Sequence, residues 1–388
     1  MDETSSPKRL QEASGGDTAI VPPVVRSASA SVSVVLALVI GIAGALVFAH
    51  FQLPLPWMLG AMGASSVAAL ARLPVTMPSL VRQPMLAIIG VMLGARLQPE
   101  LFKDVWAWLP TLALIVVFVA TSGFLCMVYF QRVAGLDPRT AYFSAMPGGL
   151  MEMIILGERS GGNVQVIALC QSARILLLVF TLPFLIRYLG DASSLTIQTG
   201  AAPSIFDADW QSHLWLLVTA AAGALFGRIA RLPAGWLFGP FLVSGLVHLA
   251  SWSNFQPSVE IVNAAQLIIG TVLGCSFARS NPALVLRMLK LSAGATVILL
   301  ATTFTFAFLA SQVSSYGFLP LLLAYSPGGL AEMSLMALVL QVETGFVVLH
   351  HIARITLVLF GARLVFSLVF KDGKAATSSL SKDARKDS

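Results

Sequence analysis

The amino-acid sequence predicts an all-α polytopic membrane protein of two inverted repeats, with about ten full spans and two re-entrant or broken helices. Three observations lead to this prediction. The composition is strongly apolar, a long motif recurs with an offset of 180 residues, and each copy of the motif interrupts apolar sequence with Pro-Gly-Gly. An internal duplication is examined first because it decides the architecture.

The composition predicts membrane spans. Hydrophobic residues make up 57% of the 388 residues and charged residues 11%, with a mean hydropathy of +0.84, whereas soluble domains carry roughly 25% charged residues. A helix needs roughly 20 apolar residues to cross roughly 30 Å of hydrocarbon. We expect the first span to be retained rather than cleaved as a leader, because no basic region with a cleavage site precedes it. The expected segments are 32–51, 56–71, 84–97, 106–130, 141–157, 164–188, 211–230, 235–252, 263–278, 288–311, 318–341 and 345–369.

The internal repeat rests on several matches. Residues Ala145–Met153 read AMPGGLMEM, and residues Tyr325–Met333 read YSPGGLAEM. Further matches are Gly90 with Gly270, Gly94 with Gly274, Arg174-Ile175 with Arg354-Ile355 and, at an offset of 179, Leu53–Gly60 with Leu232–Gly239. The spacing of these glycines predicts close helix crossings.

The basic residues of the loops predict the topology. If every segment crossed, most of them would lie outside, against the tendency of Lys and Arg to stay in the cytoplasm. If each PGGL segment enters and leaves on one side, most lie inside, and the second half is inverted relative to the first. Segments 84–97 and 263–278 compete as the non-crossing pair. The expected organisation is a cytoplasmic tail 1–31, repeat 1 at 32–190, a linker 191–210, inverted repeat 2 at 211–370 and a cytoplasmic tail 371–388.

Each Pro-Gly-Gly is predicted to unwind its helix and to free backbone groups for a ligand, because proline lacks an N–H and glycine permits unusual geometry. The helix that resumes would present its positive N-terminal end to an anion. A tight loop without a ligand is the structural alternative. The expected substrate-binding residues are Pro147, Gly148, Gly149, Pro327, Gly328, Gly329, Arg174, Arg354, Gln171 and His351.

Two glutamates and two arginines carry the predicted charges at membrane depth. Glu152 and Glu332 follow the breaks by one turn, where they could cap the helix or couple transport by binding H⁺ or Na⁺. Arg174 and Arg354 lie deep in apolar spans, where an isolated arginine costs at least ~2.5–3.5 kcal/mol. The expected partners of the arginines are the two glutamates. The pairs are either static or exchange with a substrate carboxylate or phosphate.

Gln171 and His351 stand one turn before the arginines and are expected to line the site. No metal site and no cofactor are predicted, since the adjacent His350 and His351 point apart on a helix and soft ligands are scarce nearby. The three cysteines have no close spacing and are expected to be packing residues.

The segments PWMLGAM, AMPGGLMEM and YSPGGLAEM, with two Ala-Arg-Ile sites, resemble the bacterial membrane AbrB family over residues 32–370. Members have a duplicated membrane domain and have been labelled AbrB-like regulators and ammonia monooxygenase. The resemblance implies a permease of two inverted halves with roughly five spans each. The motif positions that it carries over are Pro147, Gly148, Gly149, Glu152, Arg174, Pro327, Gly328, Gly329, Glu332, His351 and Arg354. Gln171 stands where the second half has His351, which argues against a symmetric proton relay.

The residues fit neither label. A copper monooxygenase needs a cluster of His and carboxylate ligands, and the five histidines are scattered. A transcription factor needs a soluble basic module, and both tails are short. We therefore expect no enzyme, because no nucleophile–base set is evident, and any effect on gene expression would be indirect.

The expected function is a secondary transporter of the bacterial inner membrane for a small anionic solute, coupled to H⁺ or Na⁺, with its site where the repeats meet. Exchange of a cation at the glutamates is the second choice. A membrane sensor that binds a ligand without moving it is the alternative from another class. The expected partners are the solute and the lipid bilayer, without nucleic acid, and a homodimer stays open as the assembly.

Overall fold

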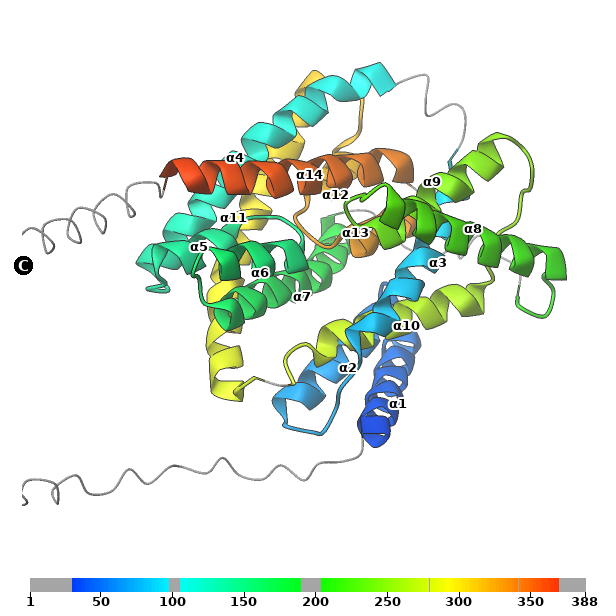
Figure 1. Ribbon diagram of the computed structural model, residues 1–388, viewed down its shortest axis with the longest axis horizontal. Coiled ribbons are helices and arrows are strands. Elements are labelled where there is room, and N and C mark those ends of the chain that lie inside the picture. The colour runs from blue at the N-terminus through cyan, green and yellow to red at the C-terminus, as the bar shows by residue number, and fades with distance from the viewer. Residues whose placement is uncertain (1–29, 98–104, 190–203, 279, 341, 370–388) are drawn as a thin grey trace, which may run out of the picture.

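The computed structural model describes residues 30–369 except 98–104, 190–203, 279 and 341 (Figure 1). The predicted tails, except residues 30 and 31 at the start of the first helix, and most of the predicted linker lie outside this described part. All regular secondary structure within it is helical, which confirms the predicted all-α class.

The two halves repeat one order of elements. The first half contains α1 (Ala30–His50), α2 (Pro56–Leu70), α3 (Arg82–Gly94), α4 (Leu109–Arg132), α5 (Pro138–Ala145), α6 (Leu150–Arg159) and α7 (Val164–Leu189), with 3₁₀ turns at Ser79–Val81 and Val105–Trp108. The second half contains α8 (Trp210–Ile229), α9 (Gly235–Leu249), α10 (Val259–Cys275), α11 (Pro282–Val313), α12 (Phe318–Tyr325), α13 (Leu330–Val339) and α14 (Thr344–Val369). Each expected apolar segment therefore contains one helix or one pair of short helices.

The long helices make this a multi-pass membrane protein. Within the described residues, 6 helices are long and apolar enough to cross a bilayer, namely α1, α4, α7, α8, α11 and α14. The other expected crossings are shorter. For example, α3 has 13 residues, which at about 1.5 Å per residue falls well short of roughly 30 Å of hydrocarbon. Length alone thus supports fewer full spans than the roughly ten predicted from hydropathy.

The helices form two groups, which we name the crossed bundle and the broken-helix bundle (Figure 1). The crossed bundle contains α1, α2, α3, α8, α9 and α10, and its halves interlock, because α3 packs on α9 and α10 packs on α2. The broken-helix bundle contains α4 to α7 and α11 to α14. The two bundles meet where α3 packs against α13 and where α7 touches α2 and α10.

Glycines bring the interlocked helices into backbone contact. A Cβ added at Gly90 would lie 2.3 Å from the carbonyl oxygen of Leu237, and one at Gly270 would lie 2.3 Å from that of Met58. The predicted close crossings are therefore confirmed at equivalent positions of the two halves. The α3–α9 and α10–α2 contacts hold the halves together.

Replacing Gly90 by alanine is expected to destabilise the protein by about 1–3 kcal/mol, because the added methyl group forces two backbones apart. The melting temperature of the detergent-purified protein measures this loss. Gly361 in α14 is a matched control, since nothing lies within 4 Å of a Cβ added there. Equal melting temperatures for Gly90→Ala and Gly361→Ala would contradict the tight crossing.

Candidate functional site

Both predicted breaks are present, and each separates two short helices. Residues 146–149 separate α5 from α6, and residues 326–329 separate α12 from α13. Gly149 and Gly329 are the N-cap residues of the resumed helices, with φ −68° and ψ 141° in the first half and φ −70° and ψ 146° in the second. Because each helix stops at its break, carbonyls at the ends of α5 and α12 need donors from elsewhere.

The first broken helix begins at a polar N-cap that precedes the apolar sequence. Asp137 is the N-cap of α5, and its carboxylate accepts the N–H of Thr140 at 3.0 Å. Thr140 in turn accepts the N–H of Asn163 at 2.8 Å, just before α7. Partial burial acts to raise the pKa of Asp137, but hydrogen bonds from Thr140 and from the N–H of Arg139 outweigh it, and the pKa lies below its usual value.

In the first half, α7 supplies the missing donors. Arg174 donates through Nη1 to the oxygen of Met146 at 2.9 Å and through Nη2 to that of Gly148 at 3.3 Å. One turn earlier, Gln171 donates through Nε2 to the oxygen of Phe143 at 2.7 Å. Both side chains are buried, and together they satisfy the end of α5 and the break.

In the second half, α14 supplies the same groups. Arg354 donates through Nη1 to the oxygen of Ser326 and through Nη2 to that of Gly328 at 3.1 Å. His351 Nε2 lies 3.0 Å from the oxygen of Leu323. A carbonyl only accepts, so Nε2 carries the proton, and the Nδ1 lone pair of a neutral ring is left free. Gln171 and His351 thus have equivalent roles at the breaks.

The prediction that the arginines pair with the glutamates is wrong. Among the described residues, neither Arg174 nor Arg354 forms an ion pair with Glu152 or Glu332. The reason is local. Each break exposes carbonyls at the negative end of a helix, and the planar guanidinium fork satisfies two of them at once.

The two glutamates fold back over the breaks. A Cβ added at Gly149 would lie 2.0 Å from Glu152 Oε2, and one at Gly329 would lie 1.9 Å from Glu332 Oε2. Each carboxylate therefore occupies the space of a side chain at the N-cap. A negative charge there is favoured by the positive end of the following helix, but neither oxygen of Glu332 accepts a hydrogen bond within the described residues, so a hydrogen-bonded cap is absent there.

The glutamates differ in their surroundings. Glu332 is 0% exposed, and its Oε1 lies 3.5 Å from Nη2 of Arg82 at the start of α3. Glu152 is partly exposed. Arg82 is one of the basic loop residues that predict the topology, and its contact with Glu332 was not predicted. Comparison of the repeats could have found it, since the equivalent position is Val262.

The two breaks come together in one region. A Cβ added at Gly148 in the first break would lie 2.8 Å from Val358 in α14. Arg354, one turn before Val358 on the same helix, donates to the carbonyl of Gly328 in the second break. The first break therefore touches the helix that holds the second break.

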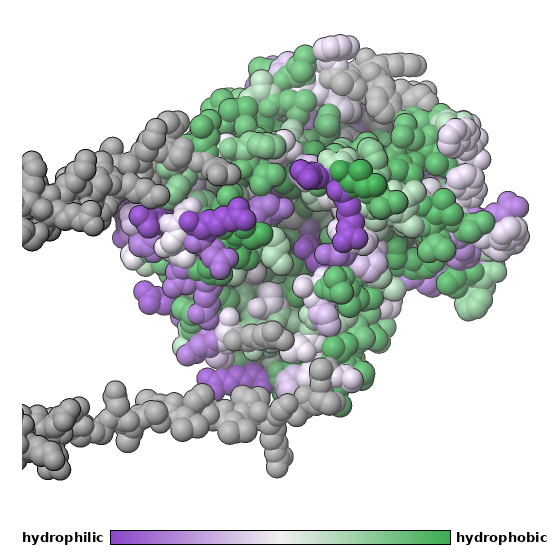
Figure 2. Space-filling view, in the orientation of Figure 1, coloured by the Kyte–Doolittle hydropathy of each residue, from purple (hydrophilic) through white to green (hydrophobic). Residues whose placement is uncertain are grey.

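This region is rich in buried polar atoms that have no hydrogen-bond partner within the described protein. An unsatisfied buried polar group costs about 1–3 kcal/mol, so a cluster of them is typical of a functional site. The cluster is Ser144 Oγ, Gln171 Oε1, Arg174 Nε, Ser326 Oγ, Glu332 Oε1 and Oε2, Ser334 Oγ, His351 Nδ1 and Arg354 Nε. Figure 2 shows hydrophilic surface in the middle of the visible face, between the two groups of helices.

Soft and basic ligands do not gather in the described part of the chain, where no three His, Cys, Asp or Glu side chains lie together as metal ligands would. His350 and His351 face different partners: Nε2 of His350 lies 2.9 Å from Thr111 Oγ1, while His351 faces Leu323. The three cysteines are unpaired and buried.

Fold and site define an all-helical, multi-pass membrane protein in which two broken helices from related halves meet at buried charges. The chain belongs to the family described as "Transition state regulatory protein AbrB", whose family model matches residues 57–370. This confirms the family expected from the PGGL motifs.

Two curated relatives are similar over most of their length. "Uncharacterized protein YhjN" of Bacillus subtilis (strain 168) is 27% identical over 293 residues, which cover 70% of this chain and 74% of the relative. "Putative regulator AbrB" of Escherichia coli (strain K12) is 23% identical over 293 residues, which cover 75% and 83%. No solved structure gives a significant match.

Proposed function

We propose that this protein is a secondary transporter with two inverted repeats and alternating access around its two broken helices. One observation carries the proposal. The breaks of both halves meet at buried charged and polar atoms, and the glutamate of one half is partly exposed while that of the other is fully buried. Unpaired buried polar groups destabilise a protein that only serves as a scaffold, whereas a carrier needs polar atoms that can form hydrogen bonds with a solute.

The charges favour a small anion as the solute. Arg82, Arg174 and Arg354 outnumber Glu152 and Glu332 in this region. The guanidinium groups of Arg174 and Arg354 each donate two hydrogen bonds to carbonyls. Their buried Nε–H groups have no hydrogen-bond partner among the described residues. A carboxylate or phosphate could accept from these donors and from the nearby hydroxyl groups.

The remaining features of the proposal follow from the transport role. H⁺ or Na⁺ couples through the two glutamates, and the protein performs no covalent chemistry. It lies in the bacterial inner membrane with both termini in the cytoplasm, in contact with lipid and not with nucleic acid, as a monomer or a homodimer. Any effect on gene expression is an indirect result of altered solute levels.

Reconstitution tests the proposal. Purified protein in liposomes is offered labelled monocarboxylates, dicarboxylates and inorganic phosphate under an inward H⁺ or Na⁺ gradient. We expect gradient-dependent uptake of one of these classes, and its loss when Glu152 and Glu332 are both replaced by glutamine. Empty liposomes and liposomes without a gradient are the controls.

The name of the Escherichia coli relative favours one other candidate, a sensor that binds a solute and does not move it. A thermal-shift screen with the same compounds separates the two functions. A compound that raises the melting temperature of the protein but never enters liposomes would support the sensor and contradict transport.

A further inference from the structure

Equivalent positions on the two resumed helices differ sharply in exposure. Met151 in α6 is 56% exposed, whereas its counterpart Ala331 in α13 is 2% exposed. Ile155 is 46% exposed, and its counterpart Leu335 is 1% exposed. The two helices carry the same motif and follow the same break. The difference therefore lies in what covers them.

The exposed side of α6 carries the apolar Met151 and Ile155 and, in its last turn, two charged residues. Glu158 and Arg159 are exposed and stand about two turns beyond Glu152 on the same short helix. Exposed charged side chains in the last turn indicate that this end of α6 meets water rather than lipid. Glu152, which is partly exposed, therefore lies on a side of α6 that the described protein leaves partly uncovered.

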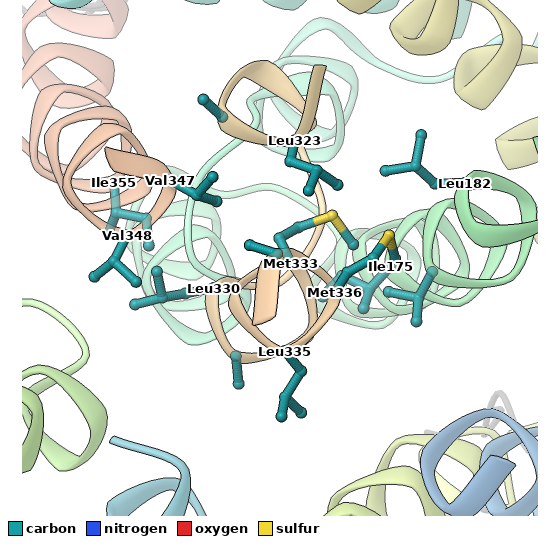
Figure 3. Close-up of a cluster of buried hydrophobic side chains, with 14 of the residues drawn as sticks. Ile175, Leu182, Leu323, Leu330, Met333, Leu335, Met336, Val347, Val348 and Ile355 are labelled. Carbon is teal, nitrogen blue, oxygen red and sulfur yellow. The ribbon is translucent and has the colours of Figure 1, made fainter. Parts of the chain in front are cut away.

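The second-half helix is covered on all sides. Ile175 and Leu182 from α7 and Val347 and Val348 from α14 surround Met333 and its neighbours (Figure 3). Leu335 points to the opposite side of α13 from Leu323, and α3 of the crossed bundle packs against α13. The α3–α13 contact is thus what closes the second side.

One ion pair lies at this contact. Arg82, whose side chain is 28% exposed, reaches the fully buried Glu332 at 3.5 Å, and the oxygens of Glu332 have no hydrogen-bond partner among the described residues. A buried carboxylate without a counter-charge is strongly disfavoured. Arg82 therefore makes it possible for an ionised Glu332 to stay closed off from water.

The first half has no such arginine. At the offset of 180 residues, Arg82 in α3 corresponds to Val262 in α10. When α6 closes against the crossed bundle in its turn, Glu152 would face an apolar side chain. An ion pair therefore stabilises the closed state of the second-half helix, and no equivalent ion pair would stabilise a closed first-half helix.

We propose that Arg82 is a positioning residue that holds α13 closed against α3, so that the resting protein keeps its first-half site open and its second-half site shut. In transport, which rests on the function proposed above, release of the Arg82–Glu332 pair is the step that lets the second side open.

Cysteine accessibility tests this directly and needs no known solute. Ile155→Cys and Leu335→Cys are matched reporters, and the parent chain, whose three cysteines are buried, gives the background. A water-soluble maleimide should modify Ile155→Cys quickly and Leu335→Cys slowly. Adding Arg82→Gln should speed the modification of Leu335→Cys by about tenfold, which corresponds to about 1.4 kcal/mol, and slow that of Ile155→Cys.

Two further variants sharpen the test. The exchange of Arg82→Glu with Glu332→Arg should restore slow labelling of Leu335→Cys. Val262→Arg, which adds the missing counter-ion to the first half, should slow labelling of Ile155→Cys. Should Arg82→Gln not fold, Arg82→Lys keeps the charge but loses the guanidinium fork, and it should label Leu335→Cys at an intermediate rate.

The outcomes separate this proposal from the transport function. Folded Arg82→Gln or Arg82→Lys protein with unchanged labelling at Leu335→Cys overturns the role of Arg82, whatever the liposomes show. A charge exchange that folds but labels like Arg82→Gln overturns it as well. If the labelling shifts as expected and no solute moves, the closing contact stands and the transport proposal fails.

Discussion

Replacing Arg354 by methionine is expected to destabilise the protein more than any other single substitution considered above. The change removes hydrogen bonds to the carbonyls of Ser326 and Gly328. Each buried carbonyl left unpaired costs about 1–3 kcal/mol. Methionine has nearly the volume of the arginine stem, so the loss reports polar satisfaction rather than packing.

The melting temperature in detergent measures the effect, which should be a drop of several degrees. Arg174→Met should behave similarly, because Arg174 donates to the equivalent carbonyls of the first half, those of Met146 and Gly148. Arg96→Met changes an exposed arginine and should melt like the parent protein. The melting temperature of Arg354→Lys should lie between those of the parent protein and Arg354→Met, because one ammonium group cannot match the planar guanidinium fork. A parent-like melting temperature for Arg354→Met would show that the carbonyls do not depend on the arginine.

Replacing Glu332 by glutamine should slow solute uptake far more than Glu152→Gln does. Glu332 is fully buried beside Arg82, so the neutral amide leaves that arginine without its counter-charge and removes the group proposed to bind the coupling ion. Glu152 is partly exposed, and water can compensate part of the change there.

Initial uptake rates in liposomes, for the solute class that the parent protein accepts, measure the difference, which we expect to reach about tenfold, equivalent to about 1.4 kcal/mol. Glu158→Gln is the matched control, because Glu158 is an exposed glutamate on the same helix as Glu152. Equal losses for Glu152→Gln and Glu332→Gln would contradict the inequivalence of the two halves. Loss of folded protein on both changes would instead indicate that the carboxylates only cap their helices.

Sequence reasoning worked where the determinant is local. The helix breaks follow from the chemistry of proline and glycine, which acts within a few residues. The close crossings follow from pairs of glycines one helical turn apart, such as Gly90 with Gly94 and Gly270 with Gly274. The position of Gln171 and His351 beside the breaks follows from the spacing of the repeat.

Sequence reasoning failed where the hydrogen-bond partner of a side chain depends on which carbonyls a helix break exposes. An arginine in apolar sequence suggested a carboxylate, but the nearer acceptors of Arg174 and Arg354 are carbonyls that exist only because each helix stops. Arg82 was missed for a related reason. Residues shared by the two halves cannot reveal Arg82, because Val262 stands at its position in the second half.

The interlocking of the crossed bundle has a consequence for biosynthesis. The glycine face of α3 fits α9, and that of α10 fits α2. During synthesis, α3 therefore lacks this partner until the polypeptide has grown past residue 249, and α2 lacks α10 until it has grown past residue 275. We therefore expect a chain truncated after α7 to be degraded as an orphan, and two separately synthesised halves to assemble when they meet in the same cell.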